Sequence, residues 1–310
     1  MMVEAGRLAP AGRRPERGGP TWRPYVALVL GLLVVPWAAI LIRLAAAPAL
    51  VTGAYRLALA SLILTPLALW RNSTEMAQLT RRDWLLLAAS GVCLGLHFAT
   101  WISSLSYTSV ASSVVLVTTS PFFVGLGARF LLRERVPAVM FVGVALAVVG
   151  GALIGWGDVA VSGRALWGDV LALAGALAAS VYYLIGRSLR QHVSLLAYVT
   201  PVYWVAALVL TGAALSTRQK LAGYPAPVYL LFLLLALGPQ VVGHSSLNWA
   251  LRYLSSTFVT ATVLAEPIGS TILAYWLLQE TVSLSKLVGG AIILVGLYIC
   301  ARAEAGRGLM

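Results

Sequence analysis

Residues 97–152 read HFATWISSLSYTSVASSVVLVTTSPFFVGLGARFLLRERVPAVMFVGVALAVVGGA, and their pattern returns later in the chain. At a fixed offset of 146 residues, Tyr107 matches Tyr253, and Pro121 matches Pro267. The same offset relates four further pairs: Glu134 and Glu280, Val136 and Val282, Gly143 and Gly289, and Gly150 and Gly296. Self-similarity of this length indicates that one structural unit is present twice.

The composition predicts a protein whose surface faces lipid. Of the 310 residues, 60% are hydrophobic and only 10% are charged, whereas soluble domains carry about 25% charged residues. The net charge of +12 does not indicate nucleic-acid binding, because the basic residues lie in short clusters between apolar runs. Cys93 and Cys300 fit no metal-binding spacing, so we expect no metal and no cofactor.

Apolar segments divide the chain into ten expected membrane-spanning helices, since a spanning helix needs about 20 apolar residues. The first repeat, 24–156, is preceded by a disordered basic tail at 1–23, and an outer linker at 157–165 separates it from the second repeat, 166–302. A short tail follows at 303–310, and the other long linker is 71–83. The ten helices are expected at 24–43, 49–70, 84–105, 109–132, 137–156, 166–186, 195–216, 227–250, 256–278 and 284–302.

The distribution of basic residues predicts the orientation in the membrane. With the N-terminus inside, sixteen of the 22 Lys and Arg residues lie on the inner side. The outer side holds six: Arg43, Arg56, Arg164, Arg218, Lys220 and Lys286. An excess of Lys and Arg marks the cytoplasmic side, so both termini are expected there. Because each half has five helices, the second half must be inverted, and the predicted fold is an all-α membrane protein of two inverted five-helix repeats.

These motifs resemble those of the drug/metabolite transporter superfamily, and more closely its EamA-type branch. The residues that carry the resemblance are Ser120-Pro121, Glu134-Arg135-Val136 and Gly143/Gly150 in the first half, with Glu266-Pro267, Glu280-Thr281-Val282 and Gly289/Gly296 in the second. Within the superfamily the chain looks most like the bacterial aromatic amino acid exporters. The resemblance implies export of amino acids across the bacterial inner membrane through a central cavity.

Two polar and aromatic stripes are the candidate substrate-binding site. His97, Trp101 and Thr100 share one helix face in the first half, and Gln240, His244 and Asn248 share one in the second. Because polar groups in lipid face the bundle interior, the two faces are expected to meet at the membrane midplane. The alternative is that these residues form helix–helix hydrogen bonds.

Aromatic residues within the expected spans predict a wall around the same cavity, where they would stack on amphipathic or aromatic solutes. Packing against lipid is the alternative for each. Trp37 is placed too deep for the membrane interface, and Tyr203 is a further candidate for binding substrate. The remaining aromatic residues of this group are Tyr55, Tyr182, Tyr183, Trp204 and Trp249.

Glu266 is the only acidic residue well inside an expected span. Such a residue marks a functional site in a membrane protein, where it would carry a proton or bind a substrate amino group. Alternatively, a protonated Glu266 satisfies a carbonyl group that Pro267 leaves without a donor. Pro36, Pro121 and Pro267 are expected to kink their helices, either as hinges or as fixed bends.

The sequence therefore predicts a transporter that exports aromatic and other neutral amino acids by alternating access. A drug or other metabolite exporter is the first alternative. A membrane-embedded enzyme is a remote one, because no catalytic motif is present. The glycine pairs are expected to pack helices within one chain, so a monomer or a weak homodimer follows. The expected partners are a small-molecule substrate and the lipid bilayer.

Overall fold

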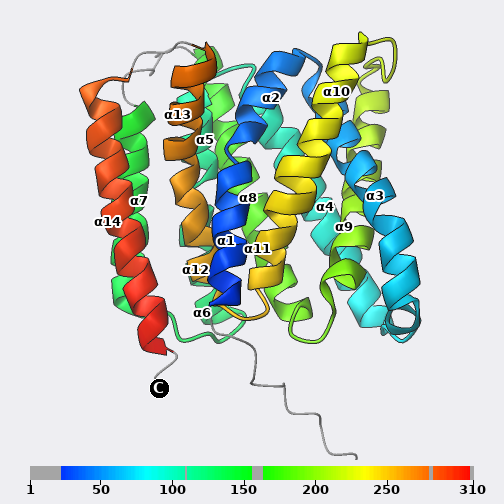
Figure 1. Ribbon diagram of the computed structural model, residues 1–310, viewed down its shortest axis with the longest axis horizontal. Coiled ribbons are helices and arrows are strands. Elements are labelled where there is room, and N and C mark those ends of the chain that lie inside the picture. The colour runs from blue at the N-terminus through cyan, green and yellow to red at the C-terminus, as the bar shows by residue number, and fades with distance from the viewer. Residues whose placement is uncertain (1–21, 109, 156–162, 279–281, 308–310) are drawn as a thin grey trace, which may run out of the picture.

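The computed structural model describes residues 22–108, 110–155, 163–278 and 282–307. The predicted tail at 1–23, apart from Trp22 and Arg23, and most of the linker at 157–165 lie outside these residues. The described residues form an all-helical bundle whose helices run roughly along one direction (Figure 1). The first helix begins and the last one ends at the same side of the bundle, the lower side in Figure 1, which we name the termini face.

Nine helical segments of the described residues are long and apolar enough to cross a membrane, and a shorter apolar helix spans Ala138–Leu153. This number, nine to ten, is that of a multi-pass membrane protein. The first half contains α1 (Arg23–Val34), α2 (Trp37–Ala45), α3 (Ala49–Ala77), α4 (Arg81–Ser104), α5 (Val110–Val117), α6 (Ser120–Phe130) and α7 (Ala138–Gly155).

The second half begins with α8 (Gly163–Leu189) and α9 (Leu195–Ser216). The next span combines α10 (Ala226–Leu235), the π-helix η2 (Ala236–His244) and α11 (Ser245–Ala250). It is followed by α12 (Ser256–Thr262), the 3-10 turn η3 (Val263–Ala265), α13 (Glu266–Leu278) and α14 (Leu284–Arg307).

Helices extend past three of the predicted span ends, because polar residues continue them beyond their apolar parts. The predicted linker at 71–83 shrinks to three residues between α3 and α4. Thr80 begins α4 as a capping box: its hydroxyl accepts from the Asp83 amide at 3.2 Å, and the Asp83 carboxylate accepts from the Thr80 amide at 3.0 Å. Likewise α8 begins at Gly163, within the predicted linker, and α14 continues into the predicted tail as far as Arg307.

Four expected spans are interrupted instead of continuous. Pro36 lies between α1 and α2, the break between α5 and α6 lies just before Pro121, Pro239 lies within η2, and η3 comes just before Pro267. Proline has no N–H and clashes with the preceding turn, so it disrupts regular helical hydrogen bonding. Proline alone does not decide this, because α9 continues through Pro201.

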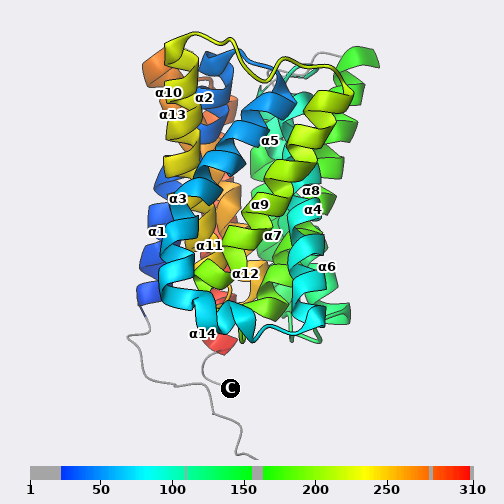
Figure 2. The ribbon, with the colours of Figure 1, turned by 90° about the vertical axis from the view of Figure 1, so that its right-hand side faces the viewer.

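Helices that the internal repeat makes counterparts lie side by side. α7 packs along α14, and α3 packs along α9. Figure 1 shows α7 beside α14, and Figures 1 and 2 both show α3 beside α9. Between the pairs, α4 packs against α8, and α1 packs against α11. The interrupted spans and α8 therefore occupy the middle of the bundle.

Gly150 provides a test of the packing between α7 and α14. A Cβ atom at Gly150 would lie 2.5 Å from the Gly289 carbonyl oxygen, whereas one at Gly151 would lie 3.6 Å from Val115. We expect Gly150→Ala to destabilise the protein by about 1–3 kcal/mol, as overpacking does, and the control Gly151→Ala to leave its stability unchanged or slightly raised. Thermal unfolding of the purified protein in detergent measures both. Equal midpoints for the two variants would contradict this packing.

Candidate functional site

A cavity lies at the centre of the bundle, where all four helix interruptions meet. Its lining includes Val35 from the first break, Thr118 from the second, His244 at the end of η2 and Val263 in η3. Irregular backbone at membrane depth is tolerated where it is buried in protein or lines a cavity. The remaining lining residues are Ala38, Arg56, His97, Trp101, Val117, Ser120, Ala179, Tyr182, Tyr183, Leu247 and Glu266.

The space inside the cavity is small. Its volume of about 40 Å³ corresponds to roughly three water molecules. A solute of amino acid size would therefore need the lining helices to move apart. The structure represents a contracted state of this cavity.

Three of the predicted binding residues line the cavity together. The rings of His97 and Trp101 stack, with centroids 5.9 Å apart and an interplanar angle of 9°. His244, from the other half of the chain, meets Phe98 edge-on at 5.4 Å between centroids. The Nδ1 atom of His97 lies 3.0 Å from the Gly175 carbonyl oxygen, which fixes the ring against α8.

Three further predicted residues are buried directly behind the lining and support it. The Gln240 side-chain oxygen accepts from Arg56 Nε at 2.7 Å. Asn248 Nδ2 donates to the Tyr182 hydroxyl at 2.5 Å and to the His244 carbonyl at 2.7 Å. The Tyr203 hydroxyl lies 3.2 Å from Ser245 Oγ. These contacts are the helix–helix hydrogen bonds of the alternative interpretation, and they also orient lining residues.

Trp37 and Thr100 lie away from the cavity lining. The Trp37 side chain is 39% exposed, and its neighbour Ala38 faces the cavity instead. The Thr100 hydroxyl donates to the carbonyls of Leu96 and His97, within its own helix. Glu266 does line the cavity and is 5% exposed, as the first residue of α13.

Arg56 is the lining residue that sequence reasoning misassigned. It was counted among the outer charges, but it lies inside α3 with an exposure of 1%. A position seven residues inside an apolar run was the available signal, because charged groups in spans mark functional sites. Tyr182 and Tyr183, which the sequence analysis places in the aromatic wall, line the cavity, and so does Ser120 of the Ser120-Pro121 motif.

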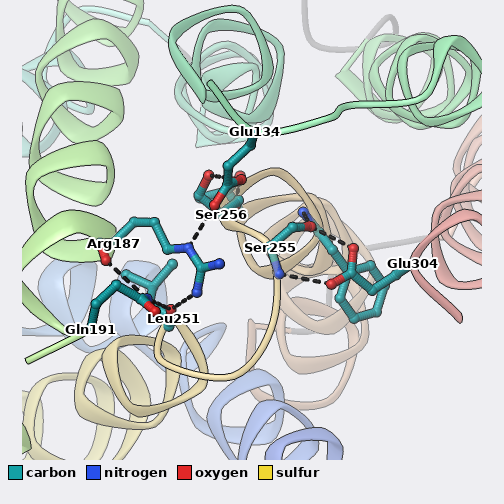
Figure 3. A network of polar contacts seen from close by, with 9 residues as sticks. Glu134, Arg187, Gln191, Leu251, Ser255, Ser256 and Glu304 are labelled. Atoms are coloured by element: carbon teal, nitrogen blue, oxygen red, sulfur yellow. Dashed lines mark hydrogen bonds and ion pairs between the residues drawn. The ribbon is translucent and has the colours of Figure 1, made fainter. Parts of the chain in front are cut away.

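A second polar network ties helix ends together at the termini face (Figure 3). Arg187 Nε pairs with Glu134 Oε1 at 2.6 Å, and Arg187 Nη1 donates to the Leu251 carbonyl at 2.5 Å. Ser256 Oγ donates to Glu134 Oε2 at 3.1 Å. Glu134 belongs to the repeated motif of the first half, and its partners in this network come from the second half of the chain. Its counterpart Glu280 lies outside the described residues.

The sequence profile of the EamA-like transporter family matches residues 23–156 and 166–302. The chain belongs to this family. An EamA-like transporter moves solutes, so family membership favours transport over the membrane-embedded enzyme. It confirms the drug/metabolite transporter resemblance at the level of the family, and the aromatic amino acid subtype stays a prediction.

Several relatives of this EamA-like transporter carry only general descriptions. An uncharacterized transporter from Archaeoglobus fulgidus is 27% identical over 79% of this chain and 85% of its own length. The inner membrane protein YtfF of Escherichia coli is 25% identical over 84% of this chain and 89% of its own. The uncharacterized transporter YetK of Bacillus subtilis is 28% identical, but the match spans only 55% of YetK.

A solved crystal structure supports the fold. It superposes with a TM-score of 0.75 at 16% identity and covers 92% of this chain and 98% of its own. At this identity the likeness concerns the fold alone.

Proposed function

We propose that the protein exports aromatic and other neutral amino acids from the cytoplasm by alternating access through the central cavity. The observation that carries this proposal is the meeting of four interrupted helices at one polar and aromatic cavity formed by both halves of the chain. In secondary transporters, substrate sites are built by discontinuous helices at the interface between repeats. The small volume of the cavity supports alternating access, since the solute must be admitted by helix movement.

The two halves form inverted repeats in this proposal, with both termini in the cytoplasm. The side-by-side pairs α3–α9 and α7–α14 support a two-fold relation, because each pair joins counterparts. The basic residues support the orientation. Removing Arg56 from the six outer charges leaves five against sixteen, so the bias that marks the cytoplasmic side becomes stronger.

A drug or other amphipathic metabolite is the second candidate substrate. A separate groove of about 410 Å³ on the side of the bundle favours it, because this groove is lined mainly by apolar side chains of α1, α9, η2 and α11. Ser245, which contacts Tyr203, is among its lining residues. This groove would give an amphipathic solute a lateral route toward the centre.

Counterflow in liposomes tests the function directly. Liposomes containing the purified protein are loaded with unlabelled amino acids, and labelled Phe, Thr or Met is added outside. Saturable exchange supports an amino acid carrier. No exchange of any amino acid by correctly folded protein would contradict the proposal and favour the second candidate.

The aromatic lining is tested by Trp101→Ala and His97→Ala. Each change removes one ring of the stacked pair, and stacking on an aromatic solute contributes about 0.5–1.5 kcal/mol beyond the area that it buries. We expect counterflow of Phe to fall roughly tenfold or more in each variant, with normal insertion into the membrane. Leu96→Ala is the control, because Leu96 lies on the same helix and is 47% exposed. Normal transport in both ring variants would place the substrate elsewhere.

A further inference from the structure

The guanidinium group of Arg56 is held by its neighbours, but within the described residues no carboxylate is hydrogen-bonded to it. Its Nε donates to Gln240, and its Cζ lies 4.3 Å from the centre of the Phe98 ring. Within the described residues, Nη1 and Nη2 have no hydrogen-bond partner, although both are buried. A buried donor left without a partner costs about 1–3 kcal/mol, and more when the group is charged. The Nη1 and Nη2 atoms therefore keep their N–H groups unused at a fixed position in the cavity.

Other donors beside Arg56 are also unused. Trp101 Nε1, which can only donate, is buried and has no partner in the described part of the chain. His244 Nδ1 is likewise buried without a partner in the described residues, and it is a donor in one of the two neutral tautomers of the ring. Both residues line the cavity with Arg56. An excess of unpaired donors indicates that the missing occupant supplies acceptor oxygens.

We propose that Arg56 is the binding site for the carboxylate group of the transported solute, with Trp101 Nε1 as an additional donor. This inference rests on the proposed function only in taking the central cavity as the transport path. The two Nη atoms form the fork that matches a carboxylate bidentately. The contact of Gln240 with Nε and the ring of Phe98 leave this fork free and keep the guanidinium plane in place.

The position of Glu266 defines the solute class further. Glu266 is the one acidic residue among those that line the cavity in the described structure. A zwitterionic amino acid presents its carboxylate to Arg56 and its ammonium group to Glu266, so that both buried charges gain a partner. A solute that carries only a positive charge leaves the Arg56 fork empty and adds a second cation to the cavity. Organic carboxylates are thus selected over amines of the same shape.

Binding of four related probes to the purified protein in detergent tests this proposal. The probes are phenylalanine, its methyl ester, phenethylamine and 3-phenylpropionate. Their binding is measured by quenching of tryptophan fluorescence and by calorimetry. Hydrogen bonds to charged groups contribute about 1.5–3 kcal/mol, so removing the carboxylate should weaken binding roughly 10- to 100-fold. In Arg56→Met the difference between acid and ester should disappear. Arg56→Lys retains the charge without the fork. Its difference in affinity between acid and ester should therefore lie between that of the unchanged protein and that of Arg56→Met.

Arg71→Met is the control variant, since Arg71 is an exposed arginine toward the far end of the same helix. It should bind all four probes as the unchanged protein does. If Arg56→Met does not fold, the proposal is still tested by comparing the affinities for acid and ester in the unchanged protein and in Arg56→Lys. Equal binding of acid and ester by the unchanged protein, or no binding of either acid, overturns the proposal.

Counterflow separates this proposal from the proposed function. Exchange of 3-phenylpropionate that depends on Arg56, without exchange of any amino acid, would support the carboxylate site and contradict amino acid export. Exchange of phenylalanine and its methyl ester at equal rates would support the transport path and overturn the role of Arg56.

Discussion

Replacing Arg187 with methionine should open the cavity toward the termini face. In the structure Arg187 joins Glu134 of the first half to the Leu251 carbonyl of the second. The side chain of Arg187 is 19% exposed and that of Glu134 is 10% exposed, so this ion pair is largely removed from water. Loss of one partner from a fully buried pair costs about 3–5 kcal/mol. Because the pair is partly exposed, we expect its loss to disfavour the arrangement seen in the structure by about 2 kcal/mol. The equilibrium then shifts roughly 30-fold toward an arrangement that is open at the termini face.

Thiol labelling measures this shift. Ala179 lines the cavity, so Ala179→Cys in a background with Cys93 and Cys300 replaced by alanine reports access to it. A membrane-impermeant maleimide added from the termini face should react roughly 30-fold faster in Arg187→Met. Arg129→Met is the control, because Arg129 is exposed at the same face. Unchanged labelling in Arg187→Met would show that the network does not hold the cavity closed.

Exchange of the two charges is a second, independent check. The double variant Glu134→Arg/Arg187→Glu restores an ion pair but loses the bond to the Leu251 carbonyl. Its labelling rate should therefore lie between those of the unchanged protein and Arg187→Met.

The all-helical membrane fold was predictable because its causes are local in the sequence. Apolar run length decides which segments cross a bilayer, and runs such as 195–216 are reproduced by α9 at both ends. The helix ends that were missed are those where polar residues prolong a helix outside the apolar part, as between Arg71 and Ala77. Apolar length carries no information there, whereas the beginning of the next helix, α4, is set by the capping box at Thr80.

The candidate site was predictable only in part, because its other residues depend on tertiary contacts. His97, Trp101 and His244 follow from helical periodicity on two counterpart helices. Arg56 does not follow from periodicity: its place inside an apolar run is the one sequence signal, and its burial depends on the packing of α3 against α9 and η2. The sequence likewise cannot reveal that Gln240 and Asn248 stand behind the lining instead of within it. That distinction is set by hydrogen bonds between residues far apart in the chain.

Replacing Glu266 with glutamine should reduce amino acid counterflow by an order of magnitude or more. The change keeps the shape of the side chain and removes the one carboxylate among the described residues that line the cavity. With Arg56 still present, the cavity then carries an uncompensated positive charge, which disfavours any solute with an ammonium group. Counterflow of labelled phenylalanine, with and without an imposed proton gradient, measures the effect.

The pattern of losses separates the two roles expected of Glu266. If its carboxylate binds the ammonium group, Glu266→Gln should reduce the counterflow of phenylalanine and leave that of 3-phenylpropionate, which has no amine, unchanged. If it carries a proton, exchange should persist for both solutes and lose its response to the proton gradient. Glu266→Asp keeps the charge on a shorter side chain, so it should restore the gradient response better than it restores ammonium binding, which depends on reach. A variant with unchanged rate, selectivity and pH dependence would exclude both roles and leave Glu266 as a structural element beside Pro267.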